Sequence, residues 1–302
     1  MSKQTEMTIA VVGDVHDLWE AEDAAALRHL KADLVLFLGD YGNESVEIVR
    51  QIAAVDLPKA AVLGNHDAHY SASSKGQQKC PYDRAREDRV QQQLDLLGAD
   101  HVGYGRREFP HLGLSVVGAR PFSWGGSSWR YRQFYRDRFG VKSFQESTAK
   151  MMAAVKSAEQ ETLIFMGHVG PYGLGSQPED PCGKDWEPMG GDCGDPDFAD
   201  AIVQSRQVGK HIPLVAFGHM HHRLRHTQDY PRKRVVVDAA GTVYLNAANV
   251  PRIVDTGTDR LRSFSLVTLA AGQVKTISLV WLNQAFETVS TELLYANQSS
   301  LK

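Results

Sequence analysis

Residues 8–16 read Thr-Ile-Ala-Val-Val-Gly-Asp-Val-His, a short apolar run that ends in a glycine and two potential metal ligands. The run is continuous rather than alternating, which is typical of a strand buried on both faces of a sheet. Four more runs share this texture and also stop at a glycine: residues 34–38, 59–63, 162–166 and 213–217. The sequence therefore predicts a fold built from buried strands that end in tight polar turns.

Helical patterns lie between these strands and predict an α/β fold with crossover connections. They cover residues 20–31, 44–54, 145–158 and 196–208. The texture changes after residue 233, where strand-like segments predict a second, more antiparallel sheet portion over about 233–285. These segments are residues 235–237, 242–245, 263–269 and 274–281. Since no Pro/Gly-rich linker interrupts the chain, a single domain is predicted over 1–302, with its motif region at 8–222.

Composition excludes several classes of function. The 302 residues contain 33 Lys and Arg against 36 Asp and Glu, so a net charge of −3 gives no global attraction to nucleic acid or anionic membranes. No apolar run approaches the roughly 20 residues of a membrane span, and the polar start lacks the features of a secretory signal. We therefore expect a cytoplasmic protein. Its three cysteines lack the short spacing of zinc sites.

Candidate metal ligands follow all five strands. In each turn a glycine permits the bend, and the next residue offers a carboxylate, an amide or an imidazole. Ligands of open α/β sheets bind at the carboxyl ends of the strands, so these side chains are expected to converge. The seven candidates are Asp14, His16, Asp40, Asn65, His168, His219 and His221. One such turn is a weak signal, whereas five in succession are hard to obtain by chance.

The chemistry of this set predicts two metal ions. Seven nitrogen and oxygen ligands are too many for one tetrahedral zinc, and none of them is sulfur. A carboxylate such as Asp40 can bridge two ions about 3.5–4 Å apart, and a hydroxide held between them is a strong nucleophile at neutral pH. His66 then remains free to act on a leaving group. Manganese, iron, zinc and magnesium, divalent or of mixed valence, all suit such ligands.

The five turns resemble the sequence blocks of the calcineurin-like metallophosphoesterase superfamily. The blocks occur in the same order: Gly13-Asp14-Val15-His16, Gly39-Asp40, Gly64-Asn65-His66-Asp67, Gly167-His168 and Gly218-His219-Met220-His221. The resemblance implies a four-layer α/β/β/α sandwich of two mixed sheets. It also implies a phosphoesterase in which a metal-bridging hydroxide attacks phosphorus in line.

The same resemblance implies a role for each residue. Asp14, His16 and His221 resemble the ligands of one metal, Asn65, His168 and His219 those of the other, and Asp40 the bridge. His66 resembles the catalytic histidine that stabilises the transition state or protonates the leaving oxygen. Asp67 resembles the acid that orients it.

Departures from the family patterns exclude one branch. Ser/Thr protein phosphatases of the superfamily carry an Asp-Arg pair after the second block and a glutamate after the Asn-His pair. Here Asp40 is followed by Tyr41-Gly42-Asn43-Glu44, and His66 by Asp67. The chain therefore does not resemble that branch.

Two segments are candidates for substrate recognition. Five arginines and seven aromatic residues interleave between residues 120 and 139, a composition that suits a phosphate and a base or sugar. The alternative is a solvated helix whose aromatic side packs on the domain. The Pro/Gly-rich stretch 170–195 follows His168 closely and is predicted to be a lid or specificity loop. The predicted substrate-binding residues are Arg120, Arg130, Arg132, Lys184 and Trp186.

The sequence thus predicts a dinuclear metal-dependent hydrolase of phosphoric esters, with a slight preference for phosphomonoesters of small molecules or nucleotides. A phosphodiesterase acting on small or cyclic nucleotide diesters is the alternative, since the same arginines would serve it. A catalytically silent binding platform is expected to have lost a ligand, and none is missing. A DNA-repair nuclease needs a basic face that this chain lacks. The expected partner is a small phosphorylated substrate, not a nucleic-acid polymer or a membrane.

Overall fold

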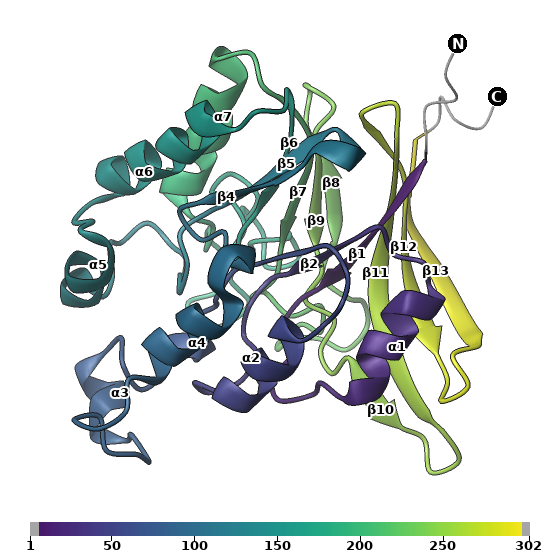
Figure 1. Ribbon diagram of the computed structural model, residues 1–302, viewed down its shortest axis with the longest axis horizontal. Coiled ribbons are helices and arrows are strands. Elements are labelled where there is room, and N and C mark those ends of the chain that lie inside the picture. The colour runs from purple at the N-terminus through teal and green to yellow at the C-terminus, as the bar shows by residue number, and fades with distance from the viewer. Residues whose placement is uncertain (1–5, 298–302) are drawn as a thin grey trace.

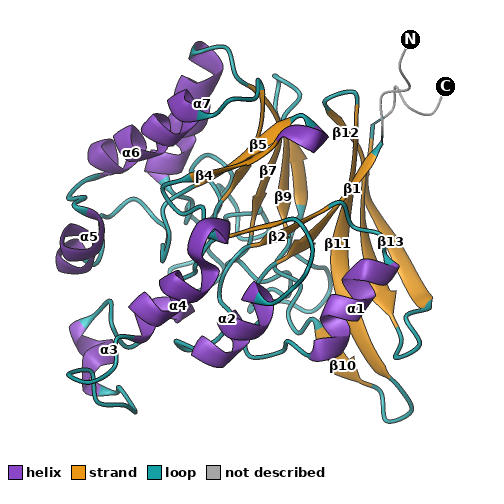
Figure 2. Ribbon diagram, in the orientation of Figure 1, coloured by secondary structure: helices purple, strands orange, loops and turns teal. Residues whose placement is uncertain are grey.

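The computed structural model describes residues 6–297. Two sheets face each other, and helices cover the outer face of each sheet (Figures 1 and 2). This arrangement confirms the α/β fold with two mixed sheets in four layers. The single domain predicted over 1–302 extends past the described residues at both ends and stays a prediction.

The first sheet has the strand order β13-β12-β11-β1-β2-β3, with β10 paired to β11. β1, β2 and β3 run parallel, whereas β11 runs antiparallel to β1 and joins the C-terminal hairpins to the sheet. The bounds are β1 Met7–Val12, β2 Leu34–Phe37, β3 Lys59–Ala61, β10 Ile253–Asp255, β11 Arg260–Ala270, β12 Gln273–Leu282 and β13 Thr288–Ala296.

The second sheet has the order β4-β5-β6-β7-β9-β8. Its central strands β5, β6, β7 and β9 are parallel, and β4 and β8 pair antiparallel at the two edges. The bounds are β4 Arg106–Phe109, β5 Leu114–Gly118, β6 Thr162–Met166, β7 His211–Phe217, β8 Val235–Val237 and β9 Val243–Asn246.

Seven helices are described on the outer faces and in the loops (Figure 1). They are α1 Ala21–His29, α2 Val46–Ala53, α3 Ser74–Gln78, α4 Arg89–Leu97, α5 Arg132–Phe139, α6 Phe144–Ser157 and α7 Pro196–Gln207. Local chemistry starts several of them: the Ser143 hydroxyl accepts the backbone N–H of Glu146 at 3.2 Å ahead of α6, and the Asp88 carboxylate accepts that of Gln91 ahead of α4.

Alternate residues of each central strand feed different apolar layers. In β1, Ile9 and Val11 point between the sheets, whereas Ala10 and Val12 pack under α1 and α2. A third layer lies between the second sheet and helices α6 and α7. Burial on both faces explains why the parallel strands read as continuous apolar runs. It also leaves their carboxyl ends as the place where polar side chains can gather.

The prediction of a second C-terminal sheet is wrong. The strands after residue 233 divide between the two sheets, because β9 pairs in parallel with β7 while β11 pairs antiparallel with β1. The antiparallel pairing itself was predicted correctly for the hairpins of β10 to β13. Long-range pairing of this kind leaves no mark in the local sequence pattern.

Candidate metal centre

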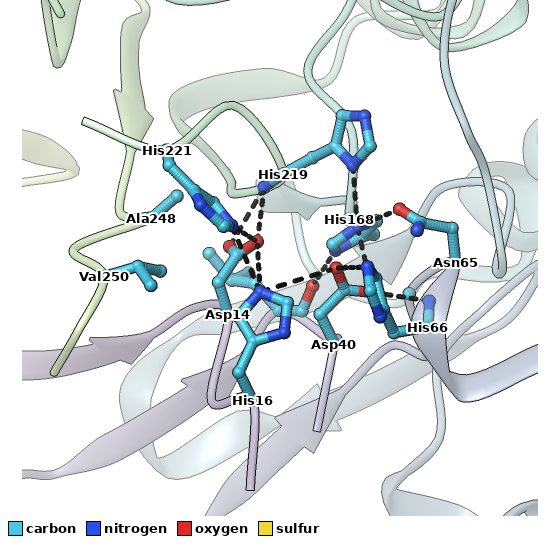
Figure 3. Close-up of polar contacts among 12 residues, drawn as sticks. Asp14, His16, Asp40, Asn65, His66, His168, His219, His221, Ala248 and Val250 are labelled. Atoms are coloured by element: carbon cyan, nitrogen blue, oxygen red, sulfur yellow. Dashed lines mark hydrogen bonds and ion pairs between the residues drawn. The ribbon is translucent and has the colours of Figure 1, made fainter. Parts of the chain in front are cut away.

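The seven predicted ligands meet at one place, where the carboxyl ends of strands from both sheets converge (Figure 3). Two carboxylates, Asp14 and Asp40, lie at the base of the group and are buried. Imidazoles surround them: His16 and His66 follow strands of the first sheet, and His168, His219 and His221 follow strands of the second. The turn after β1 thus lies against the turn after β7, which is 205 positions away along the chain.

The side chains divide into two adjoining groups. In the first, Nε2 of His221 lies 3.5 Å from Oδ1 of Asp14 and 3.1 Å from Nε2 of His16. In the second, Nε2 of His168 lies 3.3 Å from Oδ1 of Asp40, 2.9 Å from Oδ1 of Asn65 and 3.1 Å from Nδ1 of His219. Asp40 links them, because its Oδ2 is 3.9 Å from Nε2 of His16.

Close approach of the turns requires glycine at two points. A Cβ at Gly64 would lie 2.4 Å from Oδ1 of Asp40, and a Cβ at Gly218 would lie 2.1 Å from Oδ2 of Asp14. Four of the ligands themselves have left-handed backbone conformations, which are uncommon outside glycine. They are Asp14, His16, Asp40 and His219, with φ between 46° and 69°. Such strain gathers at functional sites because the surrounding fold holds it in place.

Backbone groups orient both carboxylates. The N–H of His219 donates to Oδ1 and Oδ2 of Asp14 at 3.1 and 2.9 Å, and the N–H of His66 donates to Oδ1 of Asp40 at 2.8 Å. His168 is fixed in the same way, since its Nδ1 donates to the carbonyl of Leu38 at 2.9 Å. That bond leaves Nε2 as the ring atom of His168 that faces Asp40 and Asn65.

The electrostatics of the group call for additional positive charge. Burial opposes ionisation of Asp40, but the imidazoles, His168 foremost, hold the pKa of Asp40 far below its usual range. Burial likewise lowers the pKa of His168, yet the Asp40 carboxylate raises it to about 9. The pKa of His219 falls to about 3 through burial and the neighbouring His168 charge. In the protein alone, a proton on His168 therefore balances the Asp40 charge.

This donor set fits metal ions. Three groups of side chains have ligand atoms within 4.8 Å of one another, so each can share one cation. Imidazole nitrogens that face each other at 3.1 Å, around two carboxylates, are arranged for a common cation rather than for bonds among themselves. The groups are Asp14 with His16 and His221, His16 with Asp40 and His66, and Asp40 with His168 and His219.

His66 stands at the edge of this group. Its Nε2 lies 4.0 Å from Oδ2 of Asp40, and its ring stacks at 6.5 Å on the ring of Trp124. Its Nδ1 lies 2.6 Å from Oδ1 of Asn43, which can only accept, so the ring donates from Nδ1. Asn43 therefore fixes the ring of His66 and leaves Nε2 facing the site.

The predicted contact between Asp67 and the His66 ring is wrong. The Asp67 carboxylate points away from that ring and accepts the backbone N–H groups of Asp40, Tyr41 and Gly64, at 2.9, 2.9 and 2.7 Å. It thus ties the turn after β2 to the turn after β3. Asn43 lies three residues after Asp40 in the sequence, but only the fold shows that its side chain contacts the ring of His66.

A cavity of about 480 Å³ opens above the ligands. Asp40, His66, His219 and His221 belong to its base. Its walls come from the segment after β5, from the loop 170–195 and from the stretch that follows His221. The wall residues that bear charge or an aromatic ring are Trp124, Arg130, Asp185, Trp186, Arg223, Arg225 and Arg232.

The predicted substrate residues separate into two kinds. Arg130 and Trp186 line this cavity, whereas Arg132 on α5 and Lys184 do not. Arg132 is exposed outside it, and Nζ of Lys184 lies 6.0 Å from the ring of Trp186. For these two residues the structure does not bring the side chain to the site.

The prediction that Arg120 binds the substrate is wrong. It is buried, its Nε donates to Asp197 at 2.9 Å and its Nη2 donates to Asp195 at 2.5 Å. Its guanidinium also lies 4.8 Å from the ring of Trp129 and 5.4 Å from that of Tyr135. Its Nε and Nη2 therefore bind protein carboxylates rather than a substrate, and the packed aromatic side of segment 120–139 is structural.

The loop 170–195 is held down at the rim of the cavity by Arg232, a residue that the sequence did not single out. Arg232 is buried, and its Nη1 donates to the carbonyls of Pro178, Asp180 and Gly183 at 2.7, 2.8 and 2.7 Å. Its Nε donates to the carbonyl of His221 at 3.0 Å. The loop is thereby fixed to the turn that carries two of the ligands.

Arg223 and Arg225 were missed for a different reason. Each follows His221 within four residues and flanks the buried Leu224, so the signal was their position directly after the last block.

Within residues 6–297, no helix is long and apolar enough to cross a membrane.

Known proteins were found that are similar to this chain in sequence pattern or in structure. The sequence profile of the calcineurin-like phosphoesterase family matches residues 7–223, from β1 to the turn that holds His219 and His221. No curated protein matches the chain. Among solved structures, a dimetal phosphatase from Danio rerio is similar at 12% identity, with a TM-score of 0.49 over 96% of this chain and 99% of that one. A Thermus thermophilus protein is 13% identical, with a TM-score of 0.49 over 96% and 100%, and a metallophosphoesterase from Sphaerobacter thermophilus is 14% identical, with a TM-score of 0.32 over 97% and 90%.

Proposed function

The chain belongs to the calcineurin-like phosphoesterase family, hydrolases of phosphoric ester bonds, and on this premise we propose that it removes phosphate from small phosphomonoesters, nucleotides included. The observation that carries the proposal is the charge of the cavity: Arg130, Arg223 and Arg225 line its wall above the ligand group. A phosphomonoester carries one more negative charge than a diester and gains more from such a wall. A cavity of about 480 Å³ also suits a small molecule.

We assign two metal ions to the ligand group, drawn from manganese, iron, zinc or magnesium. When bound, such a pair of ions supplies an activated water and neutralises charge on the phosphoryl oxygens. The chain's part is to hold the ligands in place, through the bonds from His219 N–H to Asp14 and from His168 to Leu38. The proposed ligands are Asp14, His16 and His221 for one ion, Asn65, His168 and His219 for the other, and Asp40 between them.

His66 is the proposed catalytic residue outside the ligand set. Its ring stands next to Asp40 with Nδ1 occupied by Asn43, so Nε2 is the atom that can meet an oxygen of the substrate. We assign its imidazolium form, in which Nε2 as well as Nδ1 carries a proton, to stabilising the transition state or donating the proton that the leaving oxygen takes up. The ring of Trp124 lies nearly parallel to that of His66 on one side.

A small or cyclic nucleotide diester is the second candidate substrate. Trp124 and Trp186 both line the cavity, and an aromatic wall beside arginines also suits a nucleotide whose phosphate is a diester. The charge of the wall favours the monoester over this candidate. A silent binding platform of the same fold would bind metal and substrate but show no turnover.

Hydrolysis of p-nitrophenyl phosphate and bis-p-nitrophenyl phosphate by chelator-stripped protein tests the proposal. Manganese, zinc, iron and magnesium are resupplied one at a time, and metal content is measured alongside the rate. Restored turnover with the monoester ahead of the diester is the expected result. A faster diester rate would favour the second candidate. Metal uptake without turnover of either compound, or of any nucleotide, would leave the silent platform and overturn the proposal.

A further inference from the structure

The outer wall of the cavity has more positive charge and more aromatic surface than one scissile phosphate uses. Resting on the proposed function, we propose that this wall is a subsite for a nucleotide base and for a second phosphate. The preferred substrate is then a nucleotide that carries a phosphate group besides the one that is removed. Four features of the wall support this: its charge balance, the position of its arginines, its ring contacts and its rigidity.

The charge balance leaves three described arginines without an acidic partner. Two carboxylates line the cavity: Asp40 belongs to the ligand group, and Oδ2 of Asp185 lies 3.2 Å from Nη2 of the buried Arg232. Among residues 6–297, Arg130, Arg223 and Arg225 form no ion pair with a carboxylate, and all three are exposed to the cavity or its mouth. Guanidinium groups that converge without an acid repel one another unless an anion joins them.

The position of these arginines separates them from the scissile site. Asp14, Asp40 and their imidazoles occupy the base, where the phosphate that is removed must bind. Arg223 and Arg225 follow the ligand turn after His221 on either side of the buried Leu224, and both are exposed and line the cavity. With Arg130 left for the phosphate at the metals, Arg223 and Arg225 suit a second anionic group.

The ring contacts indicate a flat group next to that anion. The guanidinium of Arg225 lies 5.2 Å from the centre of the Trp186 ring, and that ring is 37% exposed, which is unusual for so large an apolar group. Trp124 lies deeper and stacks on His66. A tryptophan held beside an arginine is a common platform for a nucleic-acid base.

The subsite is formed before any ligand arrives. Oδ2 of Asp185 accepts the backbone N–H of Arg225 at 3.0 Å, which places Trp186 and Arg225 next to each other. Arg232 then joins the same carboxylate to the carbonyls of the loop 170–195 and of His221. A rigid subsite loses little conformational entropy on binding, so its contacts contribute fully to affinity.

The kinetic test compares three substrates under the metal that gives turnover: adenosine 3′,5′-bisphosphate, adenosine 5′-monophosphate and ribose 5-phosphate. The expected kcat/KM falls about tenfold at each step of that series, as each step removes one anion or one ring. In the Arg223→Gln/Arg225→Gln double variant, the ratio of the first two values should fall to near one. In Trp186→Leu, the ratio of the last two should fall. Arg136→Ala, an exposed arginine on α5 outside the cavity, is the matched control and keeps both ratios.

Ratios within one variant cancel any general loss of activity, and p-nitrophenyl phosphate reports the proposed function separately. If the wild-type protein hydrolyses that compound but treats the three natural substrates alike, the subsite is wrong and the proposed function stands. Unchanged ratios in both variants would overturn the subsite as well.

Binding gives a readout that needs no turnover. Titration of metal-free protein with adenosine 3′,5′-bisphosphate should quench tryptophan fluorescence, with a dissociation constant about tenfold below that of the monophosphate. Ribose 1,5-bisphosphate should compete without quenching, and Trp186→Leu should remove most of the signal. If no metal supports hydrolysis of any ester but this binding pattern holds, the proposed function fails and the subsite survives. Equal affinity for the two adenosine nucleotides would overturn it.

Discussion

Two buried charged clusters, one around Asp40 and one around Arg120, differ in how their charges are balanced. The ligand group around Asp14 and Asp40 is an open cluster, because its charges are not matched within the protein: imidazole nitrogens face each other at 3.1 Å around the two carboxylates. The cluster around Arg120 is a closed cluster, because its charges are matched within the protein. Arg120 donates to Asp195 and Asp197, and the Ser123 hydroxyl donates to Asp195 at 2.8 Å.

The closed cluster has no need of a ligand. Burial raises the pKa of Asp195 to about 7, although Arg120 opposes the shift. Burial and charge therefore do not by themselves mark a functional site. A functional cluster has donors or acceptors that the protein leaves unmatched, whereas a structural cluster matches its own.

The largest effect should come from removing a charge at the open cluster. Asp40→Asn keeps the shape of the side chain but removes the negative charge that both metal groups share. Turnover of p-nitrophenyl phosphate should fall by about 10³-fold or more, and the bound metal per chain should fall with it. Asp200→Asn, an exposed acid on α7, is the matched control. Retention of full turnover by folded Asp40→Asn would show that Asp40 does not bridge.

The open cluster could be predicted from the sequence because each ligand sits next to a local signal. An apolar strand, a glycine and a polar residue are consecutive in the chain, and parallel strands bring their ends together. The closed cluster could not, because Asp195 and Asp197 lie 75 and 77 positions from Arg120. Arg120 therefore looked the same as Arg130 in the sequence. Burial is what separates them, and only the tertiary fold decides burial.

Variants of Arg120 and Arg130 are expected to differ in stability. Arg120→Met leaves two buried carboxylates without their cation and should lower the free energy of unfolding by about 3–5 kcal/mol. Arg130→Met should change stability by no more than about 0.5 kcal/mol, since its side chain is exposed. Urea denaturation of both variants measures the difference. An Arg120→Met protein of normal stability that lost activity would restore Arg120 to the substrate site.

A smaller effect is expected at Asn43, which orients the ring of His66 beside the open cluster. Asn43→Ala removes the acceptor for Nδ1 of His66 and frees the ring to rotate, so kcat should fall about tenfold with metal content unchanged. Asn43→Asp keeps an acceptor and should recover most of the rate.

The double variant with His66→Gln tests whether Asn43 acts through His66. His66→Gln alone should cost about 10²–10⁴-fold, and adding Asn43→Ala should then cost little more. Additive losses would mean that Asn43 acts on the substrate or the metals directly.

The smallest effect concerns a buried polar group that belongs to neither kind of cluster. Nε2 of His101 is buried next to Pro121 and has no hydrogen-bond partner among residues 6–297. Burial lowers the pKa of His101 to about 4, below the value near 6.5 of an unfolded chain. Between these two pH values the unfolded state therefore binds more protons than the folded state. The contribution to stability is complete above about pH 6.5 and is lost as the pH falls toward 4.

Comparison with His101→Leu isolates this contribution, because the metal ligands titrate in both proteins and cancel in the difference. Between pH 7 and pH 5 the wild-type protein should lose about 1 kcal/mol more unfolding free energy than the variant, less than the full shift because the side chain is not completely enclosed. Urea denaturation at the two pH values measures it. Equal losses would mean that the ring is hydrated or has a partner in solution, which would place His101 with the matched, structural groups rather than apart from them.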